Sequence, residues 1–513
     1  MKKCYLYIKL LLYLLIIGLS ATAQPLSTET IDKYIATAQQ DWNIPGMAIA
    51  IVKDGETILS KGYGTLGVNK NKAVDEHTLF AIASNTKAFI ASALAVLVSK
   101  QKINWDDKVK TYLPNFAMYD AYVSSNITIR DLLCHRSGLG TFSGDVIWYK
   151  SERSAEEVIR KIQYIPQAYD FRAGYGYSNV MFITAGEVIK SVTGKPWNIY
   201  IKETFFKPLG MERTITSTKQ LAAKGNYATP HKPLSNIAKP IEWVNWDNMG
   251  AAGGIISSVN DMAKWVNLQL ANGIFQGDTI LHPTQQNILW TPHNSHVVSH
   301  TSKKNLPGRH FNAYGLGWGL QDYFGNMIVT HSGGYDGIYS RVMLVPDENL
   351  GIIVLTNTME GIATPLSYYI VNAFIKKDQR DWSKEALEKS RKDNRREKEI
   401  AKRQATKIEN TQPTHALAAF CGTYNDPMYG KIEVYEKENT LHINFEQAPL
   451  LSATLKHWHY NTWEIIWDKT HAWFDFGTLQ FVLDNNLTVT NLKFDVPNYD
   501  IFFEELNMQK VTK

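Results

Sequence analysis

The sequence predicts an α+β domain followed by a small antiparallel β-barrel, and three observations support that prediction. Apolar runs of strand length occur at 47–64 and again at 327–357. The stretch between them, from 84 to about 200, is largely helical in pattern. Beyond residue 415, short alternating segments separated by turns return. Segments far apart along the chain are therefore expected to share one sheet.

Length and composition fit this organisation. A chain of 513 residues is too long for one core and suggests two or three domains of ~150 residues each. Hydrophobic residues make up 44% and charged residues 20% of the sequence, as is typical of a globular protein. We expect a first domain over 24–375, a charged helical linker over 376–414 and a barrel over 415–513.

Residues 1–23 are expected to be a secretory signal peptide. Two lysines precede an apolar stretch from about Leu10 to Leu19, and Ala21-Thr22-Ala23 offers a small-residue cleavage site. The apolar stretch is shorter than the ~20 residues that a membrane span requires. We therefore expect a periplasmic or secreted mature protein without a stable membrane span.

The first domain is expected to begin with a helix and a hairpin. The helix covers about Thr28 to Trp42, and strands over Met47–Val52 and Thr57–Gly64 flank a turn at Asp54-Gly55. Three further strands are expected over Met327–His331, Ser340–Val345 and Gly351–Asn357. This pattern places His331 at the end of an edge strand.

The segment Ser84-Asn85-Thr86-Lys87 stands just before an apolar run of strong helix formers. Positions i and i+3 share a helix face, so Lys87 is expected to point into a dry wall beside the Ser84 hydroxyl. A serine is a weak nucleophile near neutral pH, and a lysine can act as its base only where burial lowers the lysine pKa. The pattern indicates acyl-transfer chemistry.

This pattern is weak evidence on its own. The chain carries a second one at Ser99 and Lys102, and an N-cap is a common alternative role for Ser84. Ser84 differs because it opens its helix, where free N–H groups and the helix dipole favour a developing negative charge. The downstream groups Tyr177-Ser178-Asn179 and His331-Ser332-Gly333-Gly334 favour the catalytic role.

In this order the three motifs resemble those of the class C β-lactamase and DD-peptidase superfamily, the penicillin-binding-protein-like serine hydrolases. Ile44–Gly55 resembles the opening hairpin of that family, and Ile127–Leu139 resembles its "leucine-leucine-x-His-x-Ser-Gly" segment. Pro208–Met211 and Ala252–Ala263 fit as well. The resemblance covers roughly residues 28 to 375. It implies a β-lactamase/transpeptidase-like fold, with an antiparallel sheet flanked by helices and an all-helical region.

The resemblance implies an acyl-enzyme on Ser84 that water later hydrolyses. Lys87 and Tyr177 would manage the proton, and which of them is the base stays open. The backbone N–H groups of Ser84 and Gly334 would form the oxyanion hole. His331 replaces the lysine of true β-lactamases and would donate a hydrogen bond to Tyr177 or to a substrate carboxylate. A neutral imidazole clamps a carboxylate less strongly than an ammonium, so weak or no β-lactamase activity is expected.

Further residues are expected to contact the substrate. Asn179 would hold a substrate amide or the Lys87 head group, with a turn cap as its alternative role. Gly333 and Gly334 would let the strand approach the substrate closely. The expected substrate-binding set is Asn179, Ser332, Gly333 and Tyr335.

Nucleic acid, metal and cofactor binding are not indicated. The net charge of +5 owes much to lysines in the leader and to a basic stretch after Lys376. Two histidine groupings are candidates for zinc ligands, namely His293, His296 and His300 with helical spacing, and His457 and His459 with strand spacing. The first lacks an acidic or cysteine ligand at metal spacing, and the second fits a barrel surface. Cys134 and Cys421 fall in different predicted domains and are interpreted as buried thiols.

From Lys376 to about Ala416 the composition shifts to charged residues, which predicts an exposed helix or linker. Beyond it, Lys431–Tyr435 and Leu441–Phe445 alternate in the manner of strands. This region resembles the lipocalin-like module that follows the hydrolase domain in some relatives.

Two classes of function stay open. The favoured class is a secreted serine hydrolase that acts on a small-molecule or peptide substrate. The bond cleaved would be an amide or an ester, and D-amino-acid peptides are among the candidate substrates. The alternative is a catalytically weak, penicillin-binding-like scaffold or sensor that acts through its C-terminal barrel. The intact Ser84, Lys87 and Tyr177 favour the hydrolase, and a homo-oligomer is compatible with either class.

Overall fold

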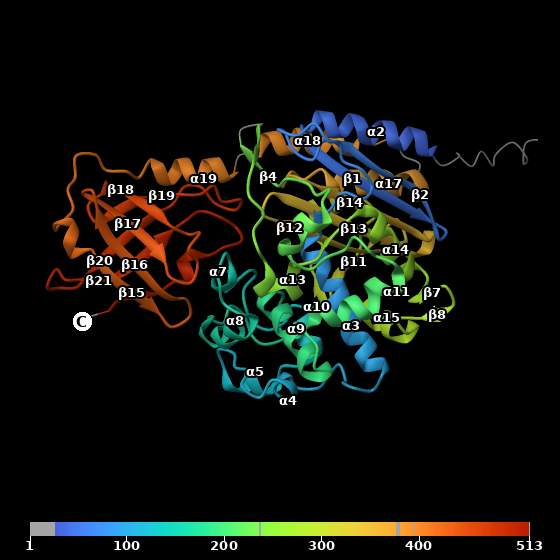
Figure 1. Cartoon of the computed structure of the whole chain (residues 1–513), viewed down its shortest axis with the longest axis horizontal. Coiled ribbons are helices and arrows are strands. Elements are labelled where there is room, and N and C mark those ends of the chain that lie inside the picture. Colours follow the sequence, from blue (N-terminus) through green and yellow to red (C-terminus); the bar gives the residue numbers. More distant parts are fainter. Residues whose placement is uncertain (1–25, 235–236, 376–379, 394, 512–513) are drawn as a thin grey trace, which may run out of the picture.

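The computed structural model describes residues 26–234, 237–375, 380–393 and 395–511. The expected signal peptide lies outside these residues. A layered N-terminal domain stands beside a barrel, and helix α19 (Arg395–Gln404) runs between them along one side (Figure 1). The predicted α+β fold with a C-terminal antiparallel barrel is therefore confirmed.

An antiparallel sheet of eight strands forms the middle layer, in the order β2-β1-β14-β13-β12-β11-β10-β9. Its strands are β1 (Gly46–Lys53), β2 (Glu56–Gly64), β9 (Asn294–His296), β10 (Asn312–Tyr314), β11 (Gly319–Tyr323), β12 (Asn326–Tyr335), β13 (Ile338–Val345) and β14 (Leu350–Thr356). Asp54 and Gly55 join β1 to β2 with φ of 53° and 86°, which is the left-handed geometry of a tight hairpin turn. The distant strands predicted to share a sheet do so, because β1 pairs with β14.

The prediction that His331 ends an edge strand is wrong. His331 lies inside β12, and β11, β10 and β9 extend the sheet beyond it. These strands are short and their sequences do not alternate clearly, which is why the sequence pattern did not reveal them. His331 pairs with Val342 of β13, and the pairing of β12 with β11 ends one residue earlier, at Thr330.

Side chains alternate across β1, so the sheet is buried on both faces. Met47, Ile49 and Ile51 pack in one core, and Ala48 and Ala50 pack in the other. The first core is covered by three helices, namely α2 (Thr28–Asp41), α17 (Ala363–Ile375) and α18 (Trp382–Lys392). Helix α18 falls in the predicted linker, yet it belongs to this layer.

Two contacts fix α18 to the layer. Trp382 stacks on Tyr368 with ring centroids 5.1 Å apart. The indole Nε1 of Trp42 donates a hydrogen bond to Ser383 Oγ at 2.9 Å. The folded N-terminal domain therefore extends to Lys392.

The other face of the sheet carries the helical region. Its helices are α3 (Thr86–Ser99), α4 (Val109–Tyr112), α5 (Ala121–Asn126), α6 (Ile129–Leu133), α7 (Asp145–Trp148), α8 (Ala155–Lys161), α9 (Asn179–Thr193), α10 (Trp197–Ile201), α11 (Lys207–Leu209), α12 (Leu221–Lys224), α13 (Gly250–Gly253), α14 (Val259–Leu270), α15 (Pro283–Leu289) and α16 (His300–Asn305). Three two-stranded ribbons lie among them, β3 (Phe80–Ala81) with β6 (Ile256–Ser257), β4 (His231–Leu234) with β5 (Ile237–Pro240), and β7 (Ile274–Phe275) with β8 (Asp278–Thr279). Helix α3 is buried along nearly its whole length and forms the axis of this region.

The barrel closes on itself without a free edge. Its strands are β15 (Gly422–Asp426), β16 (Gly430–Lys437), β17 (Thr440–Phe445), β18 (Ala453–His459), β19 (Thr462–Trp467), β20 (Thr478–Leu483), β21 (Val489–Asp495) and β22 (Met508–Lys510). Apolar side chains of each strand fill the interior, as Ile432 and Val434 of β16 do. The predicted alternation is thus observed.

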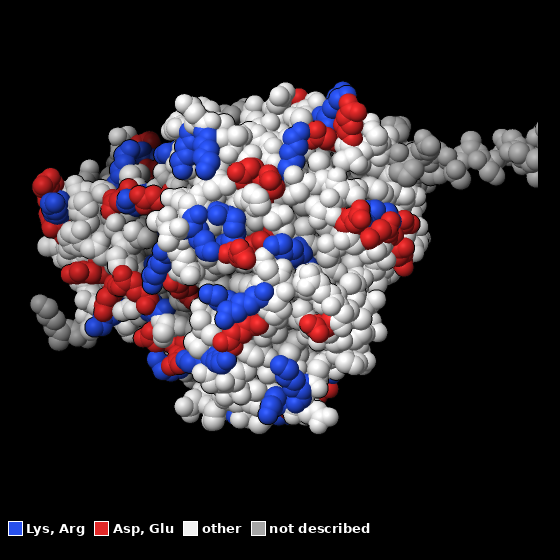
Figure 2. Space-filling view, turned by 45° about the vertical axis from the view of Figure 1, so that its right-hand side comes forward, with Lys and Arg blue, Asp and Glu red and all other residues white. Residues whose placement is uncertain are grey.

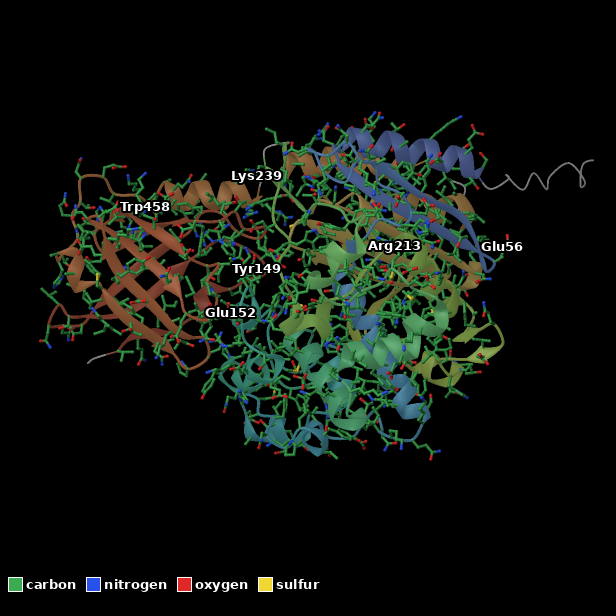
Figure 3. All side chains as sticks on the ribbon, viewed as in Figure 1. Glu56, Tyr149, Glu152, Arg213, Lys239 and Trp458 are labelled. Carbon is green, nitrogen blue, oxygen red and sulfur yellow. The ribbon has the colours of Figure 1, made fainter. Side chains whose placement is uncertain are left out.

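The barrel is docked on the N-terminal domain. Buried apolar residues of the barrel and of the helical region form one continuous core. The Lys232 ammonium, which is almost fully buried, donates to the Phe474 carbonyl of the barrel at 3.0 Å. Glu152, on the side of the N-terminal domain that faces the barrel (Figure 3), donates its N–H to Gln447 O at 2.8 Å. Helix α19 adds an ion pair between Arg403 and Asp495 at 2.7 Å.

Basic and acidic side chains are interspersed on the face that Figure 2 shows. Within the described ranges no helix is both long and apolar enough to cross a membrane. Cys134 is buried as predicted, whereas Cys421 is half-buried, and neither forms a disulfide.

Candidate active site

Ser84 lies on a tight turn that precedes helix α3. A 3₁₀ turn over Ala83–Asn85 leads directly into Thr86, the first residue of the helix. Ala83 has a φ of 46°, a left-handed conformation that costs a non-glycine residue roughly 1–2 kcal/mol. The turn is held by β13, because Ser340 Oγ donates to Ile82 O at 2.7 Å and accepts from Asn85 Nδ2 at 2.9 Å. The strained turn presents the Ser84 side chain to a cavity of about 350 Å³.

Lys87 is fully buried behind this serine, as predicted. Its Nζ lies 3.0 Å from Ser84 Oγ, 2.7 Å from Asn179 Oδ1 and 2.8 Å from the Ala252 carbonyl. Burial lowers the pKa of Lys87 to about 7, against an opposing effect of the Asp145 carboxyl. A neutral amine keeps two N–H bonds, which suffice for the amide and carbonyl oxygens. Its lone pair is then left to accept the proton of Ser84.

Tyr177 is fixed beside this pair. The Lys87 Nζ lies 4.8 Å from the centroid of the Tyr177 ring. Burial raises the pKa of Tyr177 well above its usual value, and interaction with the Ser84 hydroxyl lowers it in part. The His135 ring packs at a tilt against the tyrosine ring, with the two centroids 4.3 Å apart, and His135 accepts a hydrogen bond from Ser178 N at 3.0 Å. His135 therefore positions the whole Tyr177-Ser178-Asn179 segment.

Asp145 is a site residue that sequence reasoning missed. It lines the cavity at the start of α7 and is 2% exposed. Its carboxylate accepts hydrogen bonds from Asn179 Nδ2 at 2.7 Å and from Trp148 Nε1 at 2.8 Å. Burial raises the pKa of Asp145 to about 8. Asn179 thus bridges a buried acid and a buried amine, and its amide orientation is fixed by both.

His331 lines the cavity, but both of its ring nitrogens are engaged. Nδ1 lies 2.6 Å from the carbonyl oxygen of Ser332, which can only accept, so Nδ1 carries the proton. Nε2, 2.7 Å from the Tyr314 hydroxyl, is then the acceptor. Burial, reinforced by Lys87, lowers the pKa of His331 to about 3. The expected hydrogen bond from His331 to Tyr177 is absent from the described structure, and the imidazole is neutral.

The two glycines after His331 have different roles. A Cβ at Gly333 would lie 2.9 Å from Ala83 Cβ and 2.3 Å from Ile82 O, in the backbone of the turn that carries Ser84. Gly333 therefore lets β12 approach that turn, and it does not line the cavity. Gly334 and Ser332 do line the cavity, and a Cβ at Gly334 would meet only the Trp473 ring, at 3.1 Å.

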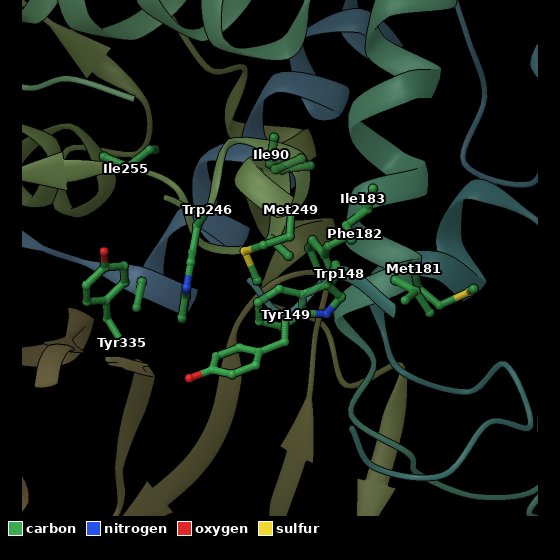
Figure 4. Close-up of a cluster of buried hydrophobic side chains, with 14 of the residues drawn as sticks. Ile90, Trp148, Tyr149, Met181, Phe182, Ile183, Trp246, Met249, Ile255 and Tyr335 are labelled. Carbon is green, nitrogen blue, oxygen red and sulfur yellow. The ribbon is translucent and has the colours of Figure 1, made fainter. Parts of the chain in front are cut away.

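Tyr335 lies behind the cavity wall, contrary to the expectation that it contacts the substrate. Its ring is 2% exposed and packs 4.6 Å from the ring of Trp246, which does line the cavity. Its hydroxyl exchanges hydrogen bonds with the backbone of Val244, with a 2.7 Å distance from the N–H. Figure 4 shows Tyr335 and Trp246 at one side of the aromatic cluster that also holds Trp148. Tyr335 is consequently a support for the wall.

The barrel supplies part of the cavity lining. Trp473 comes from the loop between β19 and β20, and Asp500 and Ile501 come from the segment that follows β21. These residues carry no sequence motif, and nothing in their spacing relates them to Ser84. The active-site cavity is therefore shared between two domains.

The other candidate groups lie apart from this cavity. Ser99 ends α3 and donates back to the Ala95 carbonyl at 3.1 Å, as an ordinary helical serine does. The first histidine grouping has no helical spacing, since His296 lies in β9 and His300 in α16. Among the described residues, no three His, Cys, Asp or Glu side chains gather as metal ligands.

Comparison with known proteins agrees with this geometry. The Beta-lactamase family model matches residues 31–373, more than half of the chain, so the chain belongs to the β-lactamase family. A domain of unknown function (DUF3471) matches residues 406–510, which include the barrel. The fold is penicillin-binding-protein-like, and the protein is a hydrolase of this family.

Three similar proteins are informative. Unguisins hydrolase ungD' from Aspergillus campestris (strain IBT 28561) is 30% identical over 78% of this chain and 76% of its own length. The octameric penicillin-binding protein homologue from Pyrococcus abyssi superposes with a TM-score of 0.60 at 18% identity, covering 94% of this chain and all of the other. EstCE1, described as a hydrolase with promiscuous acyltransferase activity, gives a TM-score of 0.57 at 19% identity and covers 67% and 98% of the two chains. The last two likenesses concern the fold alone.

Proposed function

We propose that this protein is an exported serine hydrolase that forms an acyl-enzyme on Ser84 and cleaves small amides or esters. The observation that carries the proposal is the buried Lys87 amine 3.0 Å from Ser84 Oγ, with its pKa lowered to about 7. An amine in this state can take a proton near neutral pH. Export is supported by the leader-like residues 1–23.

The reaction follows from the contacts. Ser84 Oγ attacks the substrate carbonyl while its proton passes to the Lys87 and Tyr177 pair. The N–H groups of Ser84 and Gly334 stabilise the negative charge on the carbonyl oxygen. The leaving amine or alcohol takes the proton, and an ester to Ser84 remains. Water then adds to this ester, returns a proton to Ser84 and releases the acid.

The charge of the cavity argues against efficient β-lactam hydrolysis. A β-lactam antibiotic carries a carboxylate that needs a cationic or strongly donating partner. His331 is neutral, and both of its nitrogens are already engaged. We therefore favour an amidase, peptidase or esterase activity, which accords with the similarity to a named unguisins hydrolase.

Intact-mass analysis tests the proposal directly. The mature protein is exposed briefly to p-nitrophenyl acetate and, separately, to benzylpenicillin. We expect an acetyl adduct that decays within minutes and, with penicillin, no adduct or one that persists. Ser84→Ala should prevent both adducts, and Ser99→Ala, from the second Ser-x-x-Lys pattern, is the matched control that should not.

Each outcome is informative. An acetyl adduct that survives in Ser84→Ala would contradict the nucleophile assignment. Rapid turnover of penicillin would contradict the preference for other substrates. Absence of any adduct in a folded wild-type protein would favour the alternative of a scaffold that acts through its barrel.

A further inference from the structure

The barrel places a carboxyl without a protein partner in the active-site cavity. Asp500 lines the cavity beside Trp473 and Ile501. Among the residues that the structure describes, no side chain lies within hydrogen-bond or ion-pair distance of its carboxylate. The basic group that influences it most, Arg396, is bound to Asp475 at 3.1 Å. Asp500 is therefore available to a ligand.

The segment that carries Asp500 is ordered by its own hydrogen bonds. The Asn498 amide donates to Val496 O at 2.8 Å and to Ile501 O at 2.7 Å. Its Oδ1 accepts from the N–H of Asp500 at 3.0 Å and from that of Ile501 at 2.6 Å. One side chain thus ties the segment into a closed turn. A carboxyl held in this way binds a partner with little ordering cost.

The same segment is fastened to the N-terminal domain. Glu505, four residues after Ile501, accepts a hydrogen bond from Gly144 N at 2.8 Å and another from Ser143. Gly144 directly precedes Asp145. The electrostatic influence of Asp500 on Asp145 agrees with this proximity. Asp500 consequently lies near Asp145 in the lining of the cavity.

The described lining of the cavity has no cationic group, and its ionised acid at pH 7 is Asp500, because burial raises the pKa of Asp145 to about 8 and that of Asp500 only to about 6. Its lining contains the acids Asp145 and Asp500, and among the described lining residues there is no lysine or arginine. Lys87 is sealed behind Ser84, and His331 is neutral. An anionic substrate group would meet repulsion here, whereas a cation would meet a carboxylate.

The remaining lining suits a cation as well. Trp148, Trp246 and Trp473 line the cavity with Phe142. The faces of aromatic rings attract ammonium groups, and indole does so most strongly. A carboxylate among indole rings is a combination that recognises an amine.

We propose that the barrel selects acyl donors that carry a free amine, with Asp500 binding the ammonium and Trp473 flanking it. The chemical class is an amide or ester of an amino acid whose α-amine is unblocked. This inference rests on the proposed function, because it names the substrate of the same site. A cavity of about 350 Å³ suits one residue of this kind with its leaving group.

A competition assay tests the selection. Hydrolysis of p-nitrophenyl acetate at pH 7 is inhibited with alanine anilide, as both enantiomers, and with isobutyranilide, in which a methyl group replaces the ammonium. We expect the preferred enantiomer of alanine anilide to inhibit at a concentration ~10- to 100-fold lower than isobutyranilide, the range of one charge-assisted hydrogen bond. Asp500→Asn should reduce this ratio to within about threefold.

A control variant and the hydrolysis of p-nitrophenyl acetate itself distinguish a failure of this inference from a failure of the proposed function. Glu433→Gln removes one exposed acid from β16 of the barrel and should leave the ratio unchanged. Equal inhibition by the two anilides would overturn the inference alone, and so would a high ratio that persists in Asp500→Asn. Absence of acetate ester hydrolysis in the folded wild-type protein would instead overturn the proposed function on which the inference rests.

Discussion

The two walls of the active-site cavity are built in different ways. On the N-terminal wall, Ser84, Lys87 and Asn179 stand on a turn and two helices, and each of them bonds to another. On the barrel wall, Trp473 and Asp500 come from loops, and the Asp500 carboxylate contacts no partner in the described structure. Interlocked groups on regular elements suit bond making and breaking. Loops from a second domain suit selection, because they vary without disturbing the chemistry.

Replacing Lys87, in the N-terminal wall, should have the largest effect on the acylation rate. Lys87→Met keeps the shape of the buried chain but removes the amine, so the acylation rate should fall by about 10²- to 10⁴-fold. The measurement is the p-nitrophenol burst with p-nitrophenyl acetate. Lys102→Met, in the second Ser-x-x-Lys pattern, is the control and should acylate normally. A fast burst in Lys87→Met would transfer the role of base to Tyr177.

Substitution of the two glycines of β12, Gly333 and Gly334, should give the next largest difference in stability and activity between the two walls. Gly333→Ala forces a methyl group against the nucleophile turn, which should cost about 1–3 kcal/mol of stability and most of the activity. Gly334→Ala meets only the edge of Trp473, so its effect should be a few-fold and should disappear when combined with Trp473→Ala. Thermal unfolding and kcat/KM of both variants check this. Equal damage from both substitutions would show that the barrel wall is as rigid as the N-terminal wall.

Asp145→Asn should change both the pH dependence and the maximal rate. Activity requires neutral Lys87, so kcat/KM should rise with pH through about 7. The ionised Asp145 carboxylate raises the pKa of Lys87, but its own pKa is about 8, so Asp145→Asn should move the rising limb only slightly to lower pH. Because asparagine can accept only one of the two hydrogen bonds, we also expect about a tenfold loss of rate. A rising limb that does not move would mean that Asp145 is uncharged in the working enzyme.

The smallest expected effect concerns the pH dependence of selection. Burial raises the pKa of Asp500 to about 6, with a further contribution from Asp336 and an opposing one from Arg396. Only the ionised carboxylate binds an ammonium, so the preference for alanine anilide should fall as the pH drops from 7 to 5. The affinity for isobutyranilide, measured in the same buffers, should change less. A preference that is constant over this range would contradict the assignment of Asp500.

A local pattern of the sequence was enough to predict one contact of the N-terminal wall, the one between Ser84 and Lys87. The spacing of Ser84 and Lys87, beside an apolar helix, contains the reason for their contact. The closed barrel was likewise predicted from strand alternation. Even so, the neighbours of His331 were misjudged, because the short strands β9 to β11 do not have a clear period.

The parts that escaped prediction depend on contacts between distant segments. Asp145 lies in a stretch without a motif, and only the folded chain brings it to Asn179. Trp473 and Asp500 reach the cavity because the barrel docks on the N-terminal domain, through the contact of Lys232 with Phe474 and that of Glu505 with Gly144. Spacing within a sequence carries no information on such contacts. The contacts between the barrel and the N-terminal domain become evident only in the three-dimensional structure.

In the part of the chain that the structure describes, the barrel lines the candidate active-site cavity from two loops, 468–477 and 496–502, while its strands form a closed framework of their own. Such an arrangement is modular. Exchange of these loops between related proteins should transfer the substrate preference. The residues proposed to carry out hydrolysis, which lie in the N-terminal domain, would stay unchanged. Substitutions at the tips of these loops are therefore expected to change substrate preference without disturbing Ser84 and its hydrogen-bond partners.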